Sequence, residues 1–136
     1  MWNDSLRGRP LGEIAWALNT YLRAHQPSEH FEGLGTWWWT WGKDHGAEDS
    51  AVIPPRTRWI ACYAVEGDSE GHYIHVDAIV QHPSFEKGVP HESYPLFLGK
   101  TFGGREDAYR TAQKCAEFFE SWDPITFPEK ESNREH

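Results

Sequence analysis

The sequence predicts an α+β two-layer sandwich, in which an N-terminal and a C-terminal helix cover a four-stranded, mostly antiparallel sheet. Residues 10–25 and 105–122 carry apolar side chains at three- and four-residue spacing, as amphipathic helices do. Four segments that favour strands lie between them, and hairpin-type connections indicate antiparallel pairing. Because two amphipathic helices need an apolar surface to cover, we expect both to pack on the sheet, in the order α-β-β-β-β-α.

The two helices are predicted from their apolar stripes. In the first, Pro10 suits the opening helical position, and Trp16 lies off the stripe, at the expected edge of the core. Its stripe contains Leu11, Ile14, Ala15, Leu18, Tyr21 and Leu22. The stripe of the second contains Ala108, Thr111, Ala112, Cys115, Phe119 and Trp122. Several of these are small, so this helix can approach the sheet closely.

Half of the eight Trp residues lie in the first predicted strand, residues 36–41. Side chains alternate between the two faces of a strand, so Trp37, Trp39 and Trp41 share one face. Two amphipathic helices and an apolar hairpin are available to bury that face. We therefore expect Trp38 and Thr40 to look outward, as an aromatic surface for a partner or ligand. In the alternative, the indoles simply fill the core.

The remaining strands are predicted at residues 58–65, 72–81 and 96–102. The first two form a hairpin, and their apolar residues on both faces favour central positions in the sheet. Long polar loops are expected at 43–56, which opens with the turn Lys43-Asp44-His45-Gly46, and at 82–94.

Composition bounds the class of protein. The 136 residues fit one domain at 1–123 with a charged, flexible tail at 124–136. The formal charge of −8 argues against nucleic acid or an anionic membrane as the partner. There is neither a signal peptide nor an apolar run that could cross a bilayer, so we expect a cytoplasmic protein without a membrane partner. Cys62 and Cys115 lie in no metal motif and are expected to be buried free thiols.

One local pattern resembles known families. The run Phe97-Leu98-Gly99-Lys100-Thr101-Phe102, followed by Glu106, Ala108 and Ala112, is similar to the last strand and helix of small three-stranded modules. Such modules occur in plant AP2 DNA-binding domains and in the arm-binding domains of phage integrases. The resemblance covers about a fifth of the chain and implies close strand–helix packing. It does not imply DNA binding, because the basic and aromatic base-reading residues of those families have no clear counterpart.

The candidate catalytic residues are His75 and Asp77, which share one face of the predicted strand with Tyr73. A His near a carboxylate can act as a general base or a metal ligand. A zinc site from His75, His82 and His91 is a second option, although their spacing matches no compact motif. We favour the plainer interpretation, a polar sheet face toward solvent, and we expect no cofactor and no metal.

The functional hypothesis is a small, non-catalytic cytoplasmic protein that binds a protein partner. Size, acidity and the lack of catalytic motifs also fit an accessory protein or inhibitor of host defence from a phage or mobile element. The alternatives are an enzyme or ligand binder with a His/Asp pocket, and a single-stranded nucleic-acid binder that stacks bases on Trp. A homodimer is a further option. The expected partner-binding residues are Trp38, Thr40, Lys43, Asp44, His45, Phe85, Lys87 and His91.

Overall fold

The computed structural model describes residues 6–25, 30–40, 43–46, 51–67, 71–80 and 92–122, and for 32, 37–40, 43–46 and 92 the backbone alone. The helices and strands follow the order that the sequence predicts, with one added short strand. The elements are α1 (Leu11–His25), β1 (Phe31–Thr40), β2 (Lys43–Gly46), β3 (Thr57–Glu66), β4 (His72–Val80), β5 (Glu92–Thr101) and α2 (Arg105–Ser121).

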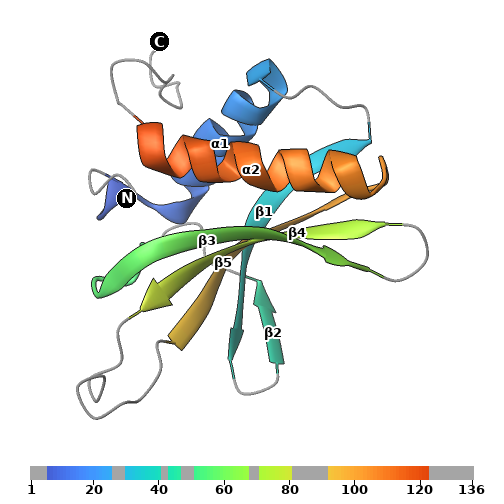
Figure 1. The fold of residues 1–136 in the computed structure, drawn as a ribbon. Coiled ribbons are helices and arrows are strands. Elements are labelled where there is room, and N and C mark those ends of the chain that lie inside the picture. The colour runs from blue at the N-terminus through green and yellow to red at the C-terminus, as the bar shows by residue number, and fades with distance from the viewer. Residues whose placement is uncertain are drawn as a thin grey trace.

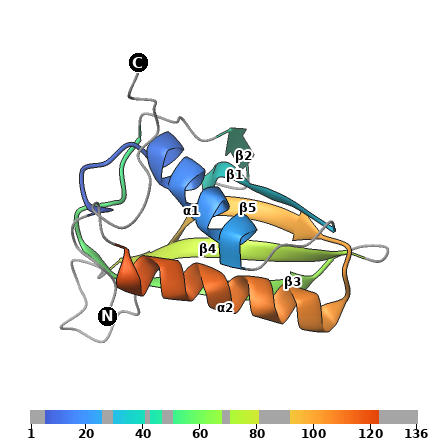
Figure 2. The ribbon, with the colours of Figure 1, turned by 90° about the horizontal axis from the view of Figure 1, so that it is seen from above.

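The strands form one antiparallel sheet in the order β2-β1-β5-β4-β3, and both helices lie on the same face of it (Figures 1 and 2). The predicted α+β two-layer arrangement is therefore confirmed. The four long strands are those expected, and β2 adds a short strand at one edge. None of the helices that the structure describes is long and apolar enough to cross a membrane.

Two expectations about the sheet are wrong. Lys43–Gly46 was expected to be a turn, but its backbone pairs with residues 37–40 of β1. A polar tetrapeptide lacks the alternation of apolar and polar residues by which a strand is recognised in a sequence. Lys43–Gly46 is a strand because its backbone pairs with β1. The strand β3 was expected to be central, but it lies at the edge. Its apolar residues on both faces do not mean burial on both faces, because Trp59, Tyr63 and Val65 are exposed.

The last strand begins earlier than predicted, at Glu92, despite Pro95. Pro95 stands opposite Asp77 at the point where the register of β4 and β5 shifts. A proline cannot donate a backbone hydrogen bond, and bulges are among the few places in a sheet that tolerate it. The part of β5 before Phe97 pairs with β4, and β1 joins only from Phe97 onward. This allows Pro95 to sit inside the strand.

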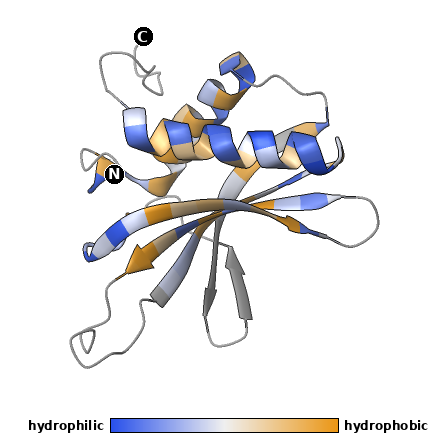
Figure 3. Cartoon of the chain, viewed as in Figure 1, coloured by the Kyte–Doolittle hydropathy of each residue, from blue (hydrophilic) through white to orange (hydrophobic). Residues whose placement is uncertain are grey.

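The core lies between the helices and the sheet. Ile74, Val76 and Phe97 are fully buried on the helix side of the sheet. Facing them are buried residues of both helices: Ile14, Leu18, Leu22, Cys115, Phe118 and Phe119. Hydrophilic and hydrophobic residues alternate along both helices in Figure 3, as the stripes require. Trp16 packs partly buried against this core, which confirms its predicted edge position.

Strands β1 and β5 approach each other closely at Gly99. A Cβ at Gly99 would lie 2.6 Å from the carbonyl oxygen of Gly33, so the pairing requires glycine here. Gly33 itself has φ 113° and lies in the bulge of β1. Ala108 and Ala112 of α2 are buried, and this helix packs mainly on β3 and β4.

Candidate functional site

The outer face of the sheet, opposite the helices, carries a row of exposed apolar side chains along β3. We define the outer row as Trp59, Tyr63 and Val65, which are 45%, 40% and 40% exposed. The alternate residues of β3, Ile60, Cys62 and Ala64, pack against the core. Because the row continues along one strand, it forms a patch rather than isolated exposed residues, and such patches mark interaction sites.

Asp77 lies beside this row and is only 4% exposed. Its Oδ2 accepts hydrogen bonds from the Tyr63 hydroxyl at 2.5 Å and from Ser93 Oγ at 3.1 Å. Its Oδ1 has no hydrogen-bond partner among the residues that the structure describes. The expected solvent-facing polar surface is therefore wrong at this position. Neighbouring strands bring their hydroxyl groups onto the carboxylate, and these hydrogen bonds compensate for burial.

The hydrogen bond fixes the protonation state of Tyr63. Burial raises the pKa of its hydroxyl, and the hydrogen bond to Asp77 and the negative charge of Asp77 raise it further. Deprotonation would remove the donor and place two negative charges side by side. Tyr63 is therefore a neutral hydrogen-bond donor at physiological pH, held in one orientation.

His75 completes the cluster from β4, directly opposite Tyr63 in the register. The two rings stack with centroids 5.1 Å apart and planes 4° apart, while Tyr73 meets His75 edge-on at 6.4 Å. Burial lowers the pKa of His75, and the charge of Asp77 opposes this shift. The imidazole is thus neutral at pH 7 and serves as a flat ring beneath Tyr63. The structure therefore places both catalytic candidates around Tyr63: His75 stacks on its ring, and Asp77 accepts a hydrogen bond from its hydroxyl.

Several predicted site residues lie outside the described parts of the chain. His82, Phe85, Lys87 and His91 are among them, so the proposed zinc site remains a prediction. For Trp38, Thr40, Lys43, Asp44 and His45 the backbone is placed and the side chains are not. Their register pairs Trp38 with His45 and Thr40 with Lys43, so these candidates share one hairpin. Among the described residues, no group of three or more His, Cys, Asp or Glu could hold a metal ion.

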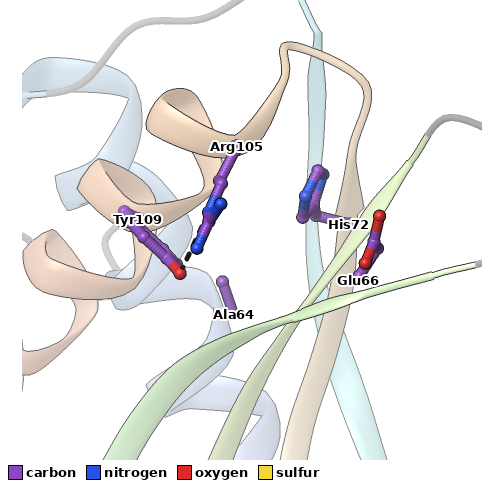
Figure 4. Close-up of a pocket in the computed structure, with 5 residues that line it drawn as sticks. All are labelled: Ala64, Glu66, His72, Arg105 and Tyr109. Atoms are coloured by element: carbon purple, nitrogen blue, oxygen red, sulfur yellow. Dashed lines mark hydrogen bonds between the residues drawn. The ribbon is translucent and has the colours of Figure 1, made fainter.

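A second, smaller site lies where α2 begins (Figure 4). A cleft of about 200 Å³ is lined by Ala64, Glu66, His72, Arg105 and Tyr109. The Arg105 side chain donates from Nε to the Tyr109 hydroxyl at 3.2 Å, and its guanidinium lies 5.4 Å from the ring centre. Within the described structure, His72 Nδ1 has no hydrogen-bond partner. The walls therefore carry both charge signs and suit a small polar group.

Sequence reasoning missed Glu66, Arg105 and Tyr109 as lining residues. The pair Gly103-Gly104 before the helix was the available signal, because a helix start can bind an anion. Gly104 has φ 94° and stands at the N-cap without a side-chain hydrogen bond. However, only the fold shows that the end of β3 and the start of β4 reach this helix terminus.

The cysteines are free thiols, as predicted. Cys115 is fully buried, and Cys62 is partly buried on the helix side of β3. Burial is the main cause that raises the pKa of Cys62 to about 12, and it raises the pKa of Cys115 as well. Both side chains are therefore protonated at neutral pH, which is the unreactive form of a thiol.

Comparison of the chain with protein-family models, curated proteins and solved structures gave no match.

Proposed function

We propose that this protein is a non-catalytic binding protein that engages a protein partner through the outer face of its sheet. The observation that carries the proposal is the outer row of Trp59, Tyr63 and Val65, exposed along one strand. Aromatic side chains dominate the binding energy of protein interfaces, because they bury large areas with few rotatable bonds.

The fixed conformation of Tyr63 on this surface supports the same proposal. The hydrogen bond to Asp77 and the stack on His75 hold the Tyr63 ring in place before any partner arrives. A preorganised ring loses little conformational entropy on binding, so more of its contact energy appears as affinity. The outer row is therefore suited to recognition.

The charge of the chain defines the chemistry of the proposed partner. With a formal charge of −8, the protein attracts surfaces that are basic around their contact region. We expect the partner's contact surface to be apolar at its centre and basic at its rim. The narrower proposal, an accessory protein or inhibitor from a phage or mobile element, rests on size, charge and the lack of catalytic motifs.

The test is affinity capture from a lysate of the native host with immobilised wild type and two matched variants. Trp59→Ala truncates the outer row, and Tyr109→Ala truncates a similarly exposed aromatic residue on α2. We expect a specific protein to bind wild type and Tyr109→Ala and to be lost with Trp59→Ala. A further variant, Trp38→Ala, tests the predicted contribution of the Trp strand.

Two results would overturn the proposal. One is that wild type captures no specific protein from the host lysate. The other is that the captured protein binds equally well to Trp59→Ala and Trp38→Ala. Because partner binding involves charge, capture by wild type should also weaken as salt rises from low to physiological concentration.

A further inference from the structure

We propose that two copies of this chain associate through β3, whose outer edges pair antiparallel about a two-fold axis at Cys62. The two five-stranded sheets then become one continuous sheet. This inference concerns the edge of β3 and a second copy of the chain, and it does not depend on the partner proposed above.

The first observation is that β3 is a long edge strand, and its pairing with β4 is regular from Trp59 to Glu66, beyond a bulge between Thr57 and Trp59. It is the last strand in the sheet order and is ten residues long, and no strand in the described structure pairs with its outer side. Natural edge strands are usually short or carry lysine, proline or inward-pointing charges that prevent pairing. The opposite edge, β2, has four residues and includes Lys43 and Asp44. In β3 the run from Trp59 to Val65 contains neither charge nor proline.

The second observation is that the charges of β3 are complementary to themselves. Its only charged residues are Arg58 near the start and Glu66 at the end, and both are exposed. Arg58 lies in the bulge between Thr57 and Trp59, directly next to the regular run. About a two-fold axis at Cys62, it lies across from Glu66 of the second copy, at both ends of the pairing. Opposite charges across a strand pair stabilise it, and like charges destabilise it.

The antiparallel register about Cys62 is favoured over the other ways in which two β3 strands could pair. A parallel pairing in register would place Arg58 beside Arg58 and Glu66 beside Glu66. An antiparallel axis at Ala61 would place Arg58 opposite Ala64, and an axis at Tyr63 would place Glu66 opposite Ile60, so each leaves one of the two charges opposite an apolar residue. A shift by a single residue would turn the side chains of one copy to the wrong face. The axis at Cys62 is therefore the arrangement that satisfies both charges and the two faces of the sheet.

The third observation concerns the outer row. With the axis at Cys62, Trp59 stands opposite Val65 of the second copy, and Tyr63 stands opposite Ala61 of the second copy. The rows of the two copies then meet across the axis and bury part of the apolar area that each exposes alone. On the helix side, Ile60 stands opposite Ala64 of the second copy, so small and large side chains are again matched.

The experiment uses charge reversal in the purified full chain, with mass measured by sedimentation velocity over a range of concentrations. We expect wild type to form a dimer, and Arg58→Glu and Glu66→Arg each to weaken dimerisation by about tenfold or more, since each variant makes both charge pairs repulsive. The matched control is Arg110→Glu on the exposed surface of α2, which should dimerise as wild type does.

The decisive step is to mix the two weakened variants. Each copy then supplies the charge that the other lacks, so the mixture should form a heterodimer although neither variant dimerises well alone. This recovery also shows that both variants are folded. A monomeric wild type would overturn the proposal and leave β3 open to a strand of a different protein. A dimer that tolerates both reversals, or a mixture that does not recover, would also overturn it.

Discussion

The hydrogen bond from Tyr63 to Asp77 should make a measurable contribution to stability. Tyr63→Phe removes one hydroxyl and leaves Asp77, which is 4% exposed, with Ser93 as its described donor. Hydrogen bonds to charged groups contribute about 1.5–3 kcal/mol. Because Tyr63 is 40% exposed, water replaces part of the lost bond, so we expect a loss in the free energy of unfolding of about 1–2 kcal/mol.

The assay is urea unfolding at pH 7, followed by far-UV circular dichroism, with an unchanged denaturant slope. Tyr109→Phe is the matched control, because its hydroxyl contacts Arg105 at an exposed site. We expect this control to stay within about 0.5 kcal/mol of wild type. In a double-mutant cycle, the cost of Tyr63→Phe should fall by about 1 kcal/mol in an Asp77→Asn background. A cost below about 0.5 kcal/mol, or one unchanged by Asp77→Asn, would refute the role assigned to this bond.

Three further predictions concern pH, a helix–strand contact and close packing. Since burial lowers the pKa of His75 in the folded state, the unfolded chain binds a proton more readily than the folded chain. The contribution of His75 to the free energy of unfolding should therefore be full above about pH 6.5 and should fall on acidification below it. Urea unfolding at a series of pH values should show a smaller fall in His75→Gln than in wild type. Asn19 bonds the backbone of β1 twice, at 2.8 and 2.9 Å, so Asn19→Ala should cost about 2 kcal/mol in the same assay, and no loss would contradict the contact. Gly99→Ala should lower the free energy of unfolding by about 1–3 kcal/mol, whereas Gly35→Ala, where an added Cβ meets nothing within 4 Å, should cost less; equal costs would count against the steric argument.

The sequence predicts the elements well where a period is long. The stripe from Leu11 to Leu22 places α1 within one residue of its observed start, and the stripe of α2 ends one residue beyond Ser121. Burial of one face determines such patterns, so they can be recognised in the chain alone. The order of the strands in the sheet cannot be predicted in this way, because Trp59 and Tyr63 fit the same alternation at an edge as they would at the centre of a sheet.

The site was only half predictable for a related reason. His75 and Asp77 attract notice because they are two residues apart on one strand. Their partner Tyr63 comes from β3, and the contact depends on a register that pairs Tyr63 with His75. Spacing along the chain does not specify that register. The same holds for Arg105, which lines one cleft with Glu66 and His72 only because α2 begins beside the turn end of the β3–β4 hairpin.

The sheet order also has a consequence for how the chain folds during synthesis. Strand β1 is synthesised early, but its long neighbour in the sheet is β5. Phe31 can therefore pair with Thr101 only after β5 has been synthesised. Strands β3, β4 and β5 follow one another and pair in sequence, and α2 comes directly after them. Local pairings form faster than distant ones. We therefore expect the part from β3 to α2 to fold first, with the N-terminal helix and its tryptophan strand added last.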